Sequence, residues 1–282
     1  MRNPLSALRQ IAIKHADHPL LIASLLLAVI VLTGIQWLPA SWQLPVTAWF
    51  VLLYVSAASL NTYRLTQQRI HDHQRQMQAL MALHQQLPFR APIPSLSGWA
   101  ATPELMVQIL NTVRSRKPRT VLELGSGAST VMIPYMLEQT GGGRVFSIDH
   151  EEAYAASTRR NLALHGVEGV TLNVAPLTDI PLHGARYRWY DLSATQLPDS
   201  IDMLIVDGPP EQTNPMARYP ALPLLWDRMS DGAVILMDDA DRPDEQEIIR
   251  RWKAEFDLDV DMNPFILKGF ALLTVRKTET GA

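Results

Sequence analysis

The 282-residue sequence contains no cysteine, so disulfide bonds and metal sites built on thiolates are excluded. It also lacks a basic excess, since 25 Lys and Arg residues stand against 28 Asp and Glu residues and the formal net charge is −3. A chain without an overall positive field is not expected to bind nucleic acid. Charge of either sign is missing from residues 19–63, which contain no Asp, Glu, Lys or Arg.

The uncharged stretch holds two apolar runs. The first, Leu20–Leu38, is long enough to cross a hydrocarbon core of about 30 Å and exceeds the roughly 7–15 residues of a signal-peptide core. The second, Leu44–Leu60, is shorter, and the link of residues 39–43 is short and uncharged. We therefore expect residues 19–60 to form a transmembrane helical hairpin, with a buried hairpin or a signal peptide as the alternatives.

Basic residues flank both apolar runs, and such residues are retained on the cytoplasmic side of a membrane. They are Arg2, Arg9, Lys14, Arg64, Arg69 and Arg75. We therefore expect residues 1–18 to be a cytoplasmic segment. The hairpin would lie in the inner (cytoplasmic) membrane, and the rest of the chain would face the cytoplasm.

Residues 61–97 are expected to form a stalk and a linker. From residue 61 to 86 the chain is free of Gly and Pro, and apolar residues recur at loosely helical spacing, which favours a helix that offers a surface for a homodimer. His71, His73 and His84 have no cysteine or carboxylate partners arranged with them, so we favour a solvated helix face over a metal site. The proline-rich run that begins at Leu87 ends the helix.

Residues 98–282 alternate between strand-like and helix-like patterns. Thr102, Pro103 and Glu104 combine a cap, a proline and an acid, as helix starts do. Strands are expected at 120–124, 144–149, 170–174, 201–207, 233–238, 258–262 and 270–275, and helices at 128–139, 151–165 and 244–256. This alternation predicts an α/β, Rossmann-like, mostly parallel sheet with helices on both faces, whose ligands bind at the carboxyl ends of the strands.

The first expected strand ends in the glycine-rich sequence Glu123-Leu-Gly-Ser-Gly. Gly125 and Gly127 allow the backbone to turn sharply and approach a ligand, and the helix that follows presents its N-terminus to an anion. Asp149 ends the next strand, where a carboxylate accepts ribose hydroxyls. A glycine turn followed by an acid one strand later is the nucleoside-binding pattern of Rossmann-like folds.

Two departures from the dinucleotide motif Gly-x-Gly-x-x-Gly indicate which nucleoside is bound. Thr130 stands where a third glycine would allow close helix packing beside a pyrophosphate. Glu123, two residues before the first glycine, would repel a pyrophosphate but suits a ligand with an ammonium group. Both departures favour S-adenosylmethionine (SAM) over NAD, and a glycine turn without a ligand is the plain structural alternative.

Residues from about 96 to 275 resemble class I SAM-dependent methyltransferases, in particular a bacterial membrane-anchored subgroup. The resemblance is carried by residues 98–103, 123–130, 146–150, 174–177, 206–210 and 237–242. It implies a seven-stranded sheet whose last strand is antiparallel, with SAM lying across the first two strands. The cofactor contacts expected on this basis are Glu123, Gly125, Ser126, Gly127, Thr130, Asp149, Ala175 and Pro176.

Acids follow the fourth and fifth expected strands, as Asp207 and as the pair Asp238 and Asp239. The arrangement resembles the catechol O-methyltransferase family, in which such residues hold magnesium, although Asp239 stands where that family has Asn. Three alternatives stay open: a site for Mg²⁺ or a similar cation on all three acids, a metal-free general base, or helix caps. We expect Asp207 and Asp238 to be catalytic under the first two.

The sequence therefore predicts a membrane-anchored SAM-dependent methyltransferase that acts on a small or lipid-linked acceptor, with O-methylation favoured. Four residues in connections on the ligand-facing side either contact the substrate or pack locally. They are Trp189, Tyr190, Arg218 and Tyr219. The alternative functions are another transferase or an NAD-linked oxidoreductase on the same fold, and a non-catalytic membrane scaffold.

Overall fold

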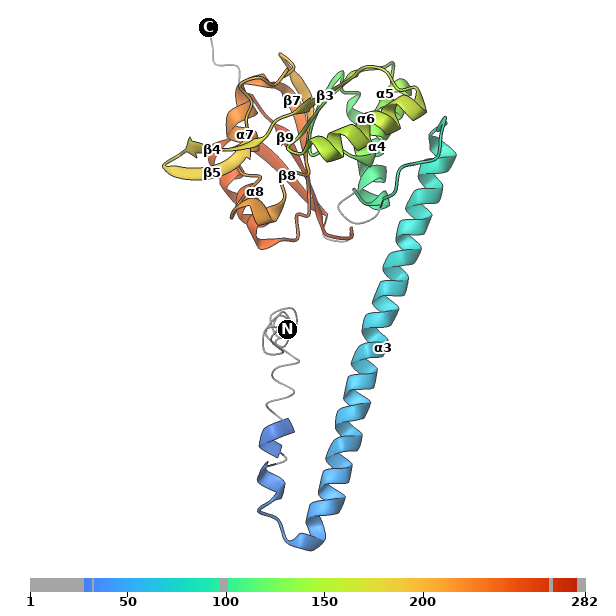
Figure 1. The fold of residues 1–282 in the computed structure, drawn as a ribbon, viewed down its shortest axis with the longest axis vertical. Helices are drawn as coiled ribbons and strands as arrows, with labels where there is room; N and C mark the ends of the chain where they lie inside the picture. The colour runs from blue at the N-terminus through green and yellow to red at the C-terminus, as the bar shows by residue number, and fades with distance from the viewer. Residues whose placement is uncertain (1–27, 32, 97–100, 264–265, 278–282) are drawn as a thin grey trace, which may run out of the picture. The chain divides into compact units, whose positions relative to one another are not determined.

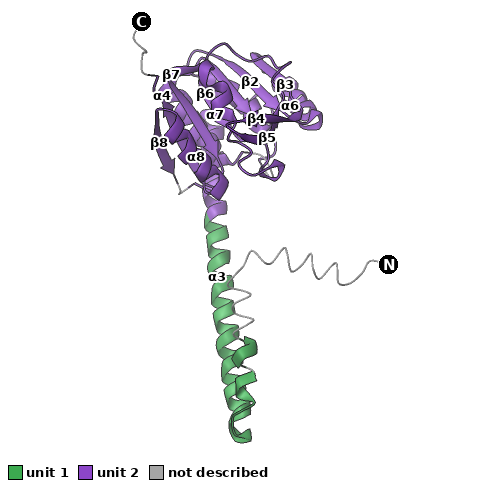
Figure 2. Ribbon diagram, turned by 90° about the vertical axis from the view of Figure 1, so that its left-hand side faces the viewer, with its two compact units in different colours: residues 1–71 green, residues 72–282 purple. Residues whose placement is uncertain are grey.

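The computed structural model describes residues 28–31, 33–96, 101–263 and 266–277. The chain divides into two compact units, residues 1–71 and 72–282 (Figure 2). The expected cytoplasmic segment of residues 1–18 and about half of the first apolar run, residues 20–27 and 32, lie outside the described residues. The described residues therefore cover the second predicted span in full and the first only in part.

The second apolar run and the expected stalk form one continuous helix, α3 (Ala40–Gln86) (Figure 1). Among the described residues, α3 is the one helix that is long and apolar enough to cross a membrane, by length and composition only. Large apolar side chains such as Trp42, Leu44 and Trp49 are exposed on it. An apolar N-terminal helix is thus present, whereas the two-helix hairpin is not established.

The second unit contains a seven-stranded sheet, whose first five strands in the order β3-β2-β1-β6-β7 are parallel. β9 then runs antiparallel to both β7 and β8, as the resemblance implied. The strands are β1 (Thr120–Leu124), β2 (Arg144–Asp149), β3 (Val170–Val174), β6 (Ile201–Val206), β7 (Met229–Asp238), β8 (Leu258–Asn263) and β9 (Phe270–Val275). The predicted strand positions and the mostly parallel sheet are confirmed.

Helices cover both faces of this sheet, because alternate residues of each buried strand point to opposite sides. Val121 packs with α4 (Pro103–Arg116) and α5 (Ala128–Glu138) in one core, whereas its neighbour Leu122 packs with α7 (Ala221–Leu225) and α8 (Pro243–Glu255) in the other. The remaining helix, α6 (Glu152–His165), packs beside α5, β2 and β3. The 3-10 turns η1 (Glu211–Thr213) and η2 (Trp226–Arg228) complete the elements.

The end of α3 belongs to the same unit as the sheet. Leu83 and Leu87 are almost fully buried and join the core that α4 and α5 form against the sheet. Residues 72–96, which the sequence assigns to the stalk and linker, are therefore part of this compact unit. α4 begins as predicted, because the Thr102 hydroxyl accepts a hydrogen bond of 3.2 Å from the backbone N–H of Leu105.

A two-stranded hairpin, β4 (Leu177–Leu182) and β5 (Ala185–Tyr190), was not predicted. It closes through His183 and Gly184, which both have positive φ, as tight two-residue hairpin turns require. Half of the residues of β4 and half of those of β5 are exposed, and the two strands lack the apolar run that marks the buried strands. The hairpin bears on the candidate active site because Tyr190, the last residue of β5, lines the cavity there.

Candidate active site

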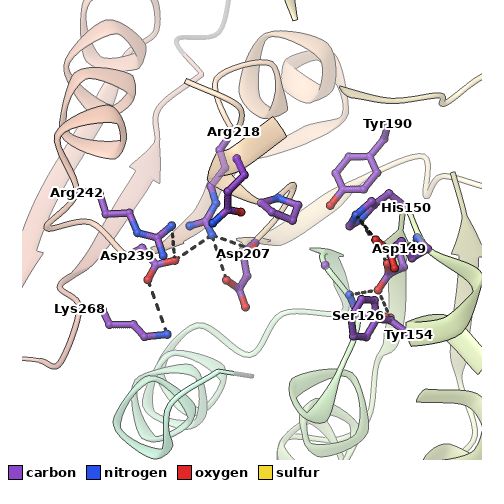
Figure 3. Close-up of a pocket in the computed structure, with 15 residues that line it drawn as sticks. Ser126, Asp149, His150, Tyr154, Tyr190, Asp207, Arg218, Asp239, Arg242 and Lys268 are labelled. Carbon is purple, nitrogen blue, oxygen red and sulfur yellow. Dashed lines mark hydrogen bonds and ion pairs between the residues drawn. The ribbon is translucent and has the colours of Figure 1, made fainter. Parts of the chain in front are cut away.

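The carboxyl ends of β1, β2, β6 and β7 meet at one edge of the sheet, where a cavity of about 240 Å³ opens (Figure 3). Parallel α/β sheets bind ligands at this edge. Most of the lining residues follow strands, come from the loops after them, or lie at the start of a helix. They are Gly125, Ser126, Asp149, His150, Glu151, Tyr154, Tyr190, Asp207, Gly208, Pro210, Gln212, Arg218, Asp239, Arg242 and Lys268.

The glycine loop after β1 passes very close to the end of β6. Gly125 has a φ of +99°, which side chains disfavour, and its N–H donates to the Ile148 carbonyl at 2.8 Å. A Cβ at this position would lie 3.4 Å from the backbone carbonyl carbon of Asp207. The positive φ therefore favours glycine at this turn, whereas a Cβ would meet the acid that follows β6 at an ordinary contact distance.

Asp149 joins the glycine loop to the cavity wall. Its Oδ2 accepts hydrogen bonds from the Ser126 backbone N–H, at 3.0 Å, and from the Ser126 hydroxyl. Its Oδ1 accepts from the N–H of Glu151 at 3.0 Å. The Asp149 side chain is almost fully buried yet lines the cavity, so its orientation is fixed before any ligand binds.

Glu123 lies behind the loop, outside the cavity lining. It is fully buried, and its Oε2 accepts from the hydroxyls of Thr130 at 2.5 Å and Ser147 at 2.7 Å. Thr130 in turn accepts from the N–H of Gly127 at 2.9 Å, so the residue in place of a third glycine ties the loop to Glu123. Burial raises the pKa of Glu123, and its Oε1 has no hydrogen-bond partner among the described residues.

The structure thus separates the eight expected cofactor residues into two groups. Gly125, Ser126 and Asp149 line the cavity. Glu123, Gly127, Thr130, Ala175 and Pro176 do not line it. The second group supports the loop from behind or, in the case of Ala175 and Pro176, follows β3 at the same edge of the sheet.

The acids that follow β6 and β7 converge as the strand order predicts. One carboxylate oxygen from each of Asp207, Asp238 and Asp239 lies within 4.8 Å of the others. Asp238 and Asp239 are buried, whereas the side chain of Asp207 is 21% exposed at the cavity. Asp207 and Asp239 line the cavity, and Asp238 lies behind them.

Arg218 lies among these acids, a role that the sequence left undecided. Its guanidinium donates to the backbone oxygens of Asp238 at 2.9 Å and Asp207 at 3.0 Å, and to Oδ2 of Asp239 at 3.0 Å. Two further cations reach Asp239: Arg242 Nη1 lies 3.0 Å from Oδ2, and Lys268 Nζ lies 3.9 Å from Oδ1. The signal that was available in the sequence, a lone arginine in a connection, did not identify these partners.

Burial and mutual repulsion perturb the acids. Burial, with the charge of Asp238 as the next cause, raises the pKa of Asp207 well above its usual range. Burial and the neighbouring Asp239 raise the pKa of Asp238. Burial alone would lower the pKa of Arg218, but the surrounding carboxylates outweigh it and raise that pKa, so the guanidinium stays charged. A carboxylate with a raised pKa at a cavity suits proton transfer.

Tyr190 is a second residue whose role the sequence left open. Its hydroxyl is buried, faces the cavity between Asp149 and Asp207 in Figure 3, and has no hydrogen-bond partner among the described residues. Burial raises the pKa of this hydroxyl well above its usual range. A Cβ on Gly208 would lie 2.3 Å from the hydroxyl oxygen, so glycine at 208 makes room for Tyr190.

Comparisons with known proteins agree with this architecture. Residues 122–240, from β1 to the residues after β7, match a family model described as a methyltransferase domain. A SAH-bound methyltransferase from Podospora anserina superposes with a TM-score of 0.51 at 15% identity, over 72% of this chain and 88% of that one. An O-methyltransferase from Bacillus cereus in complex with SAH gives 0.49 at 15%, over 71% and 90%. No curated protein sequence matches the chain.

Proposed function

We propose that this chain, whose residues 122–240 match a methyltransferase-domain family, is a class I SAM-dependent methyltransferase that transfers a methyl group from SAM to an oxygen atom of its acceptor. The observation that carries the proposal is a single cavity that joins two sets of groups. Its β1–β2 side has the glycine loop and Asp149, which suit a nucleoside, and its β6–β7 side has Asp207, which suits proton transfer. Binding and transfer thus share one site.

The residues at the β1–β2 side fit SAM. Gly125 keeps the loop free of a side chain where it faces the end of β6, and Asp149 is held in place to accept hydrogen bonds from ribose hydroxyls. The cofactor residues we assign are Glu123, Gly125, Ser126, Gly127, Thr130, Asp149, Ala175 and Pro176. In this assignment Glu123 and Thr130 act by fixing the loop, since both are fully buried.

SAM supplies a methyl group on a sulfonium. An acceptor hydroxyl that attacks this methyl must lose its proton as the new O–C bond forms and the S–C bond breaks. We assign the proton to Asp207, whose carboxylate lines the cavity and whose raised pKa favours proton uptake. Asp238 supports this role from behind, because its charge helps to raise the pKa of Asp207.

A divalent cation is the alternative way to activate the acceptor. Asp207, Asp238 and Asp239 offer the hard oxygen ligands that Mg²⁺ prefers. They do not stand alone, however, because Arg218, Arg242 and Lys268 already lie against them. These contacts favour the metal-free general base.

Membrane anchoring is part of the proposed function. We propose that the apolar part of α3 lies in the inner membrane, paired with the first apolar run. Arg64, Arg69 and Arg75 would then keep the catalytic unit on the cytoplasmic side. Such an anchor suits a small or lipid-linked acceptor at the membrane, and the later part of α3 offers a surface for a homodimer.

Extraction of bacterial membranes with alkaline carbonate tests the membrane anchor: the chain should stay in the pellet, and recovery in the supernatant contradicts the anchor.

Calorimetric titration of the detergent-solubilised full chain tests the methyltransferase assignment. We expect SAM to bind with micromolar-range affinity and NADH not to bind. Asp149→Ala should weaken SAM at least about 30-fold, whereas Asp179→Ala, which removes an exposed acid of β4, should leave it unchanged. Binding of NADH in preference to SAM would support the oxidoreductase alternative and overturn the proposal.

A further inference from the structure

We propose that Arg218 takes the place of a divalent cation among the strand-end acids, so that this chain transfers its methyl group without a metal. In this account Arg218 is a positioning residue, because it holds Asp207 in place and does not itself react. The statement about transfer rests on the proposed function. The statement about cation binding does not, and it can be tested without an acceptor.

The guanidinium of Arg218 is buried and hydrogen-bonded to the acids around it. Its side chain is 4% exposed, and its two terminal nitrogens are both engaged. Through the backbone oxygens of Asp207 and Asp238, the guanidinium joins the carboxyl end of β6 to that of β7. A buried guanidinium with this many acceptors is held firmly, so the acids cannot meet a metal ion without displacing it.

The guanidinium of Arg218 lies against the carboxylates that would bind a cation. Arg218 Nη2 lies 3.0 Å from Oδ2 of Asp239 and 3.4 Å from Oδ1 of Asp207 (Figure 3). These oxygens belong to the same carboxylates that would coordinate a cation. A Mg²⁺ ion binds its oxygen ligands at about 2.0–2.1 Å, so an ion on these carboxylates would lie next to a like charge in a largely buried site.

The strand-end acids and the basic residues around them form one charged cluster. Glu245, which is buried, joins the three aspartates, with its Oε1 3.7 Å from both Arg218 and Arg242. Lys268 adds a third positive charge beside Asp239. Arg242 also pairs with the exposed Glu211 at 3.1 Å. Three cations of the chain thus already offset much of the charge of the buried acids, which weakens their attraction for a divalent ion.

The consequence for transfer is that Asp207 is oriented by an arginine. Arg218 fixes the backbone oxygen of Asp207 at 3.0 Å, while the Asp207 carboxylate keeps its exposed side toward the cavity. The carboxylate is therefore free to take the acceptor proton. A metal site would use the same carboxylate as a ligand and would leave it unable to do so.

Electron paramagnetic resonance of free Mn²⁺ tests the inference on the full chain in detergent. The wild type should take up no Mn²⁺ at this cluster up to about 1 mM. Arg218→Met should gain one site that Mg²⁺ competes for and that the added change Asp239→Asn removes. Arg218→Lys, which keeps the positive charge, should gain none. Arg242→Met is the matched control, since it removes a cation from Asp239 but leaves Arg218 in place.

Stoichiometric Mn²⁺ uptake by the wild type, abolished by Asp207→Asn, would overturn the inference. So would a folded Arg218→Met chain that gains no site. If Arg218→Met fails to fold, the wild-type titration together with Arg218→Lys still decides. SAM binding, measured on the same samples, separates the two claims. If the wild type does not bind SAM, the proposed function is wrong but the Mn²⁺ result still holds. If the wild type takes up Mn²⁺, only the role of Arg218 is wrong.

Discussion

The two sides of the cavity hold their carboxylates in opposite ways. On the β1–β2 side, Glu123 and Asp149 accept hydrogen bonds mainly from hydroxyls and backbone N–H groups, and the imidazole Nδ1 of His150 lies 3.5 Å from Oδ1 of Asp149. On the β6–β7 side, Asp207 and Asp239 lie against arginine. Hydroxyl and N–H donors hold a carboxylate in place without neutralising it, whereas guanidinium groups hold it in place and also neutralise it.

This contrast assigns different tasks to the two sides. A carboxylate that hydroxyl and N–H donors hold rigidly suits the recognition of ribose hydroxyls. A charge-balanced cluster with raised pKa values suits the movement of a proton. Variants on the two sides should therefore affect different steps.

The largest expected effect concerns transfer. Asp207→Asn removes the proposed proton acceptor, so methyl transfer should fall about 10²- to 10⁴-fold, which is the usual contribution of a general base. The affinity for SAM should change less than about 3-fold, because Asp149 and the glycine loop are untouched. Transfer of labelled methyl groups from SAM into cell extracts measures the first quantity, and Asp199→Asn, an exposed acid before β6, is the control. Equal transfer by Asp207→Asn would break the contrast.

A smaller effect is expected from the support of the loop. Thr130→Ala removes one of the hydroxyl donors to Glu123, with Ser147 remaining, and leaves the N–H of Gly127 without its acceptor. Loss of these buried bonds costs about 1–3 kcal/mol, which corresponds to a fall of several degrees in melting temperature. SAM affinity should fall about 10-fold. Thr130→Ser keeps the hydroxyl and should restore both values; a serine variant as weak as the alanine one would show that the methyl group, not the hydrogen bonds, matters.

The smallest effect is on the pH dependence of stability. Because the pKa of Asp207 is higher in the folded chain than its unfolded value near 3.8, the folded state binds more protons between these two values. The free energy of unfolding therefore falls as the pH rises through this window. Asp207→Asn removes this loss of stability, so above the window its melting temperature should exceed that of the wild type, by about 2–4 °C for each kcal/mol of difference in the free energy of unfolding. The difference should shrink as the pH falls toward 3.8; a constant difference would refute this account of Asp207.

The sequence predicted the parts of this site that local patterns encode. Short apolar runs marked the buried strands, and the acids at their ends, such as Asp149 and Asp207, then followed from the parallel topology. The role of Arg218 was not predicted, because its partners lie 11 to 21 residues away along the chain and contact it only after folding. The role of Tyr190 was not predicted, because the hairpin that carries it lacks the apolar pattern of a buried strand.

Two further differences have physical causes. Glu123 was expected beside the cofactor, but its hydrogen bonds to Thr130 and Ser147 hold it behind the loop, since a buried carboxylate needs donors. The second apolar run and the helix expected over residues 61–86 were treated as separate segments, yet they form one helix, α3, from Ala40 to Gln86. No Gly or Pro interrupts residues 61–86, so a change from apolar to polar side chains alters the surroundings of the helix without ending it.

The most direct test of the central claim is one calorimetric series of SAM binding to the detergent-solubilised wild type, Asp149→Ala and Asp207→Asn. Asp149→Ala should weaken SAM at least about 30-fold, because it removes the carboxylate that anchors the β1–β2 side, whereas Asp207→Asn should stay within about 3-fold of the wild type. If Asp149→Ala binds SAM as tightly as the wild type, or if both variants lose it equally, the division of the cavity into a binding side and a transfer side is wrong.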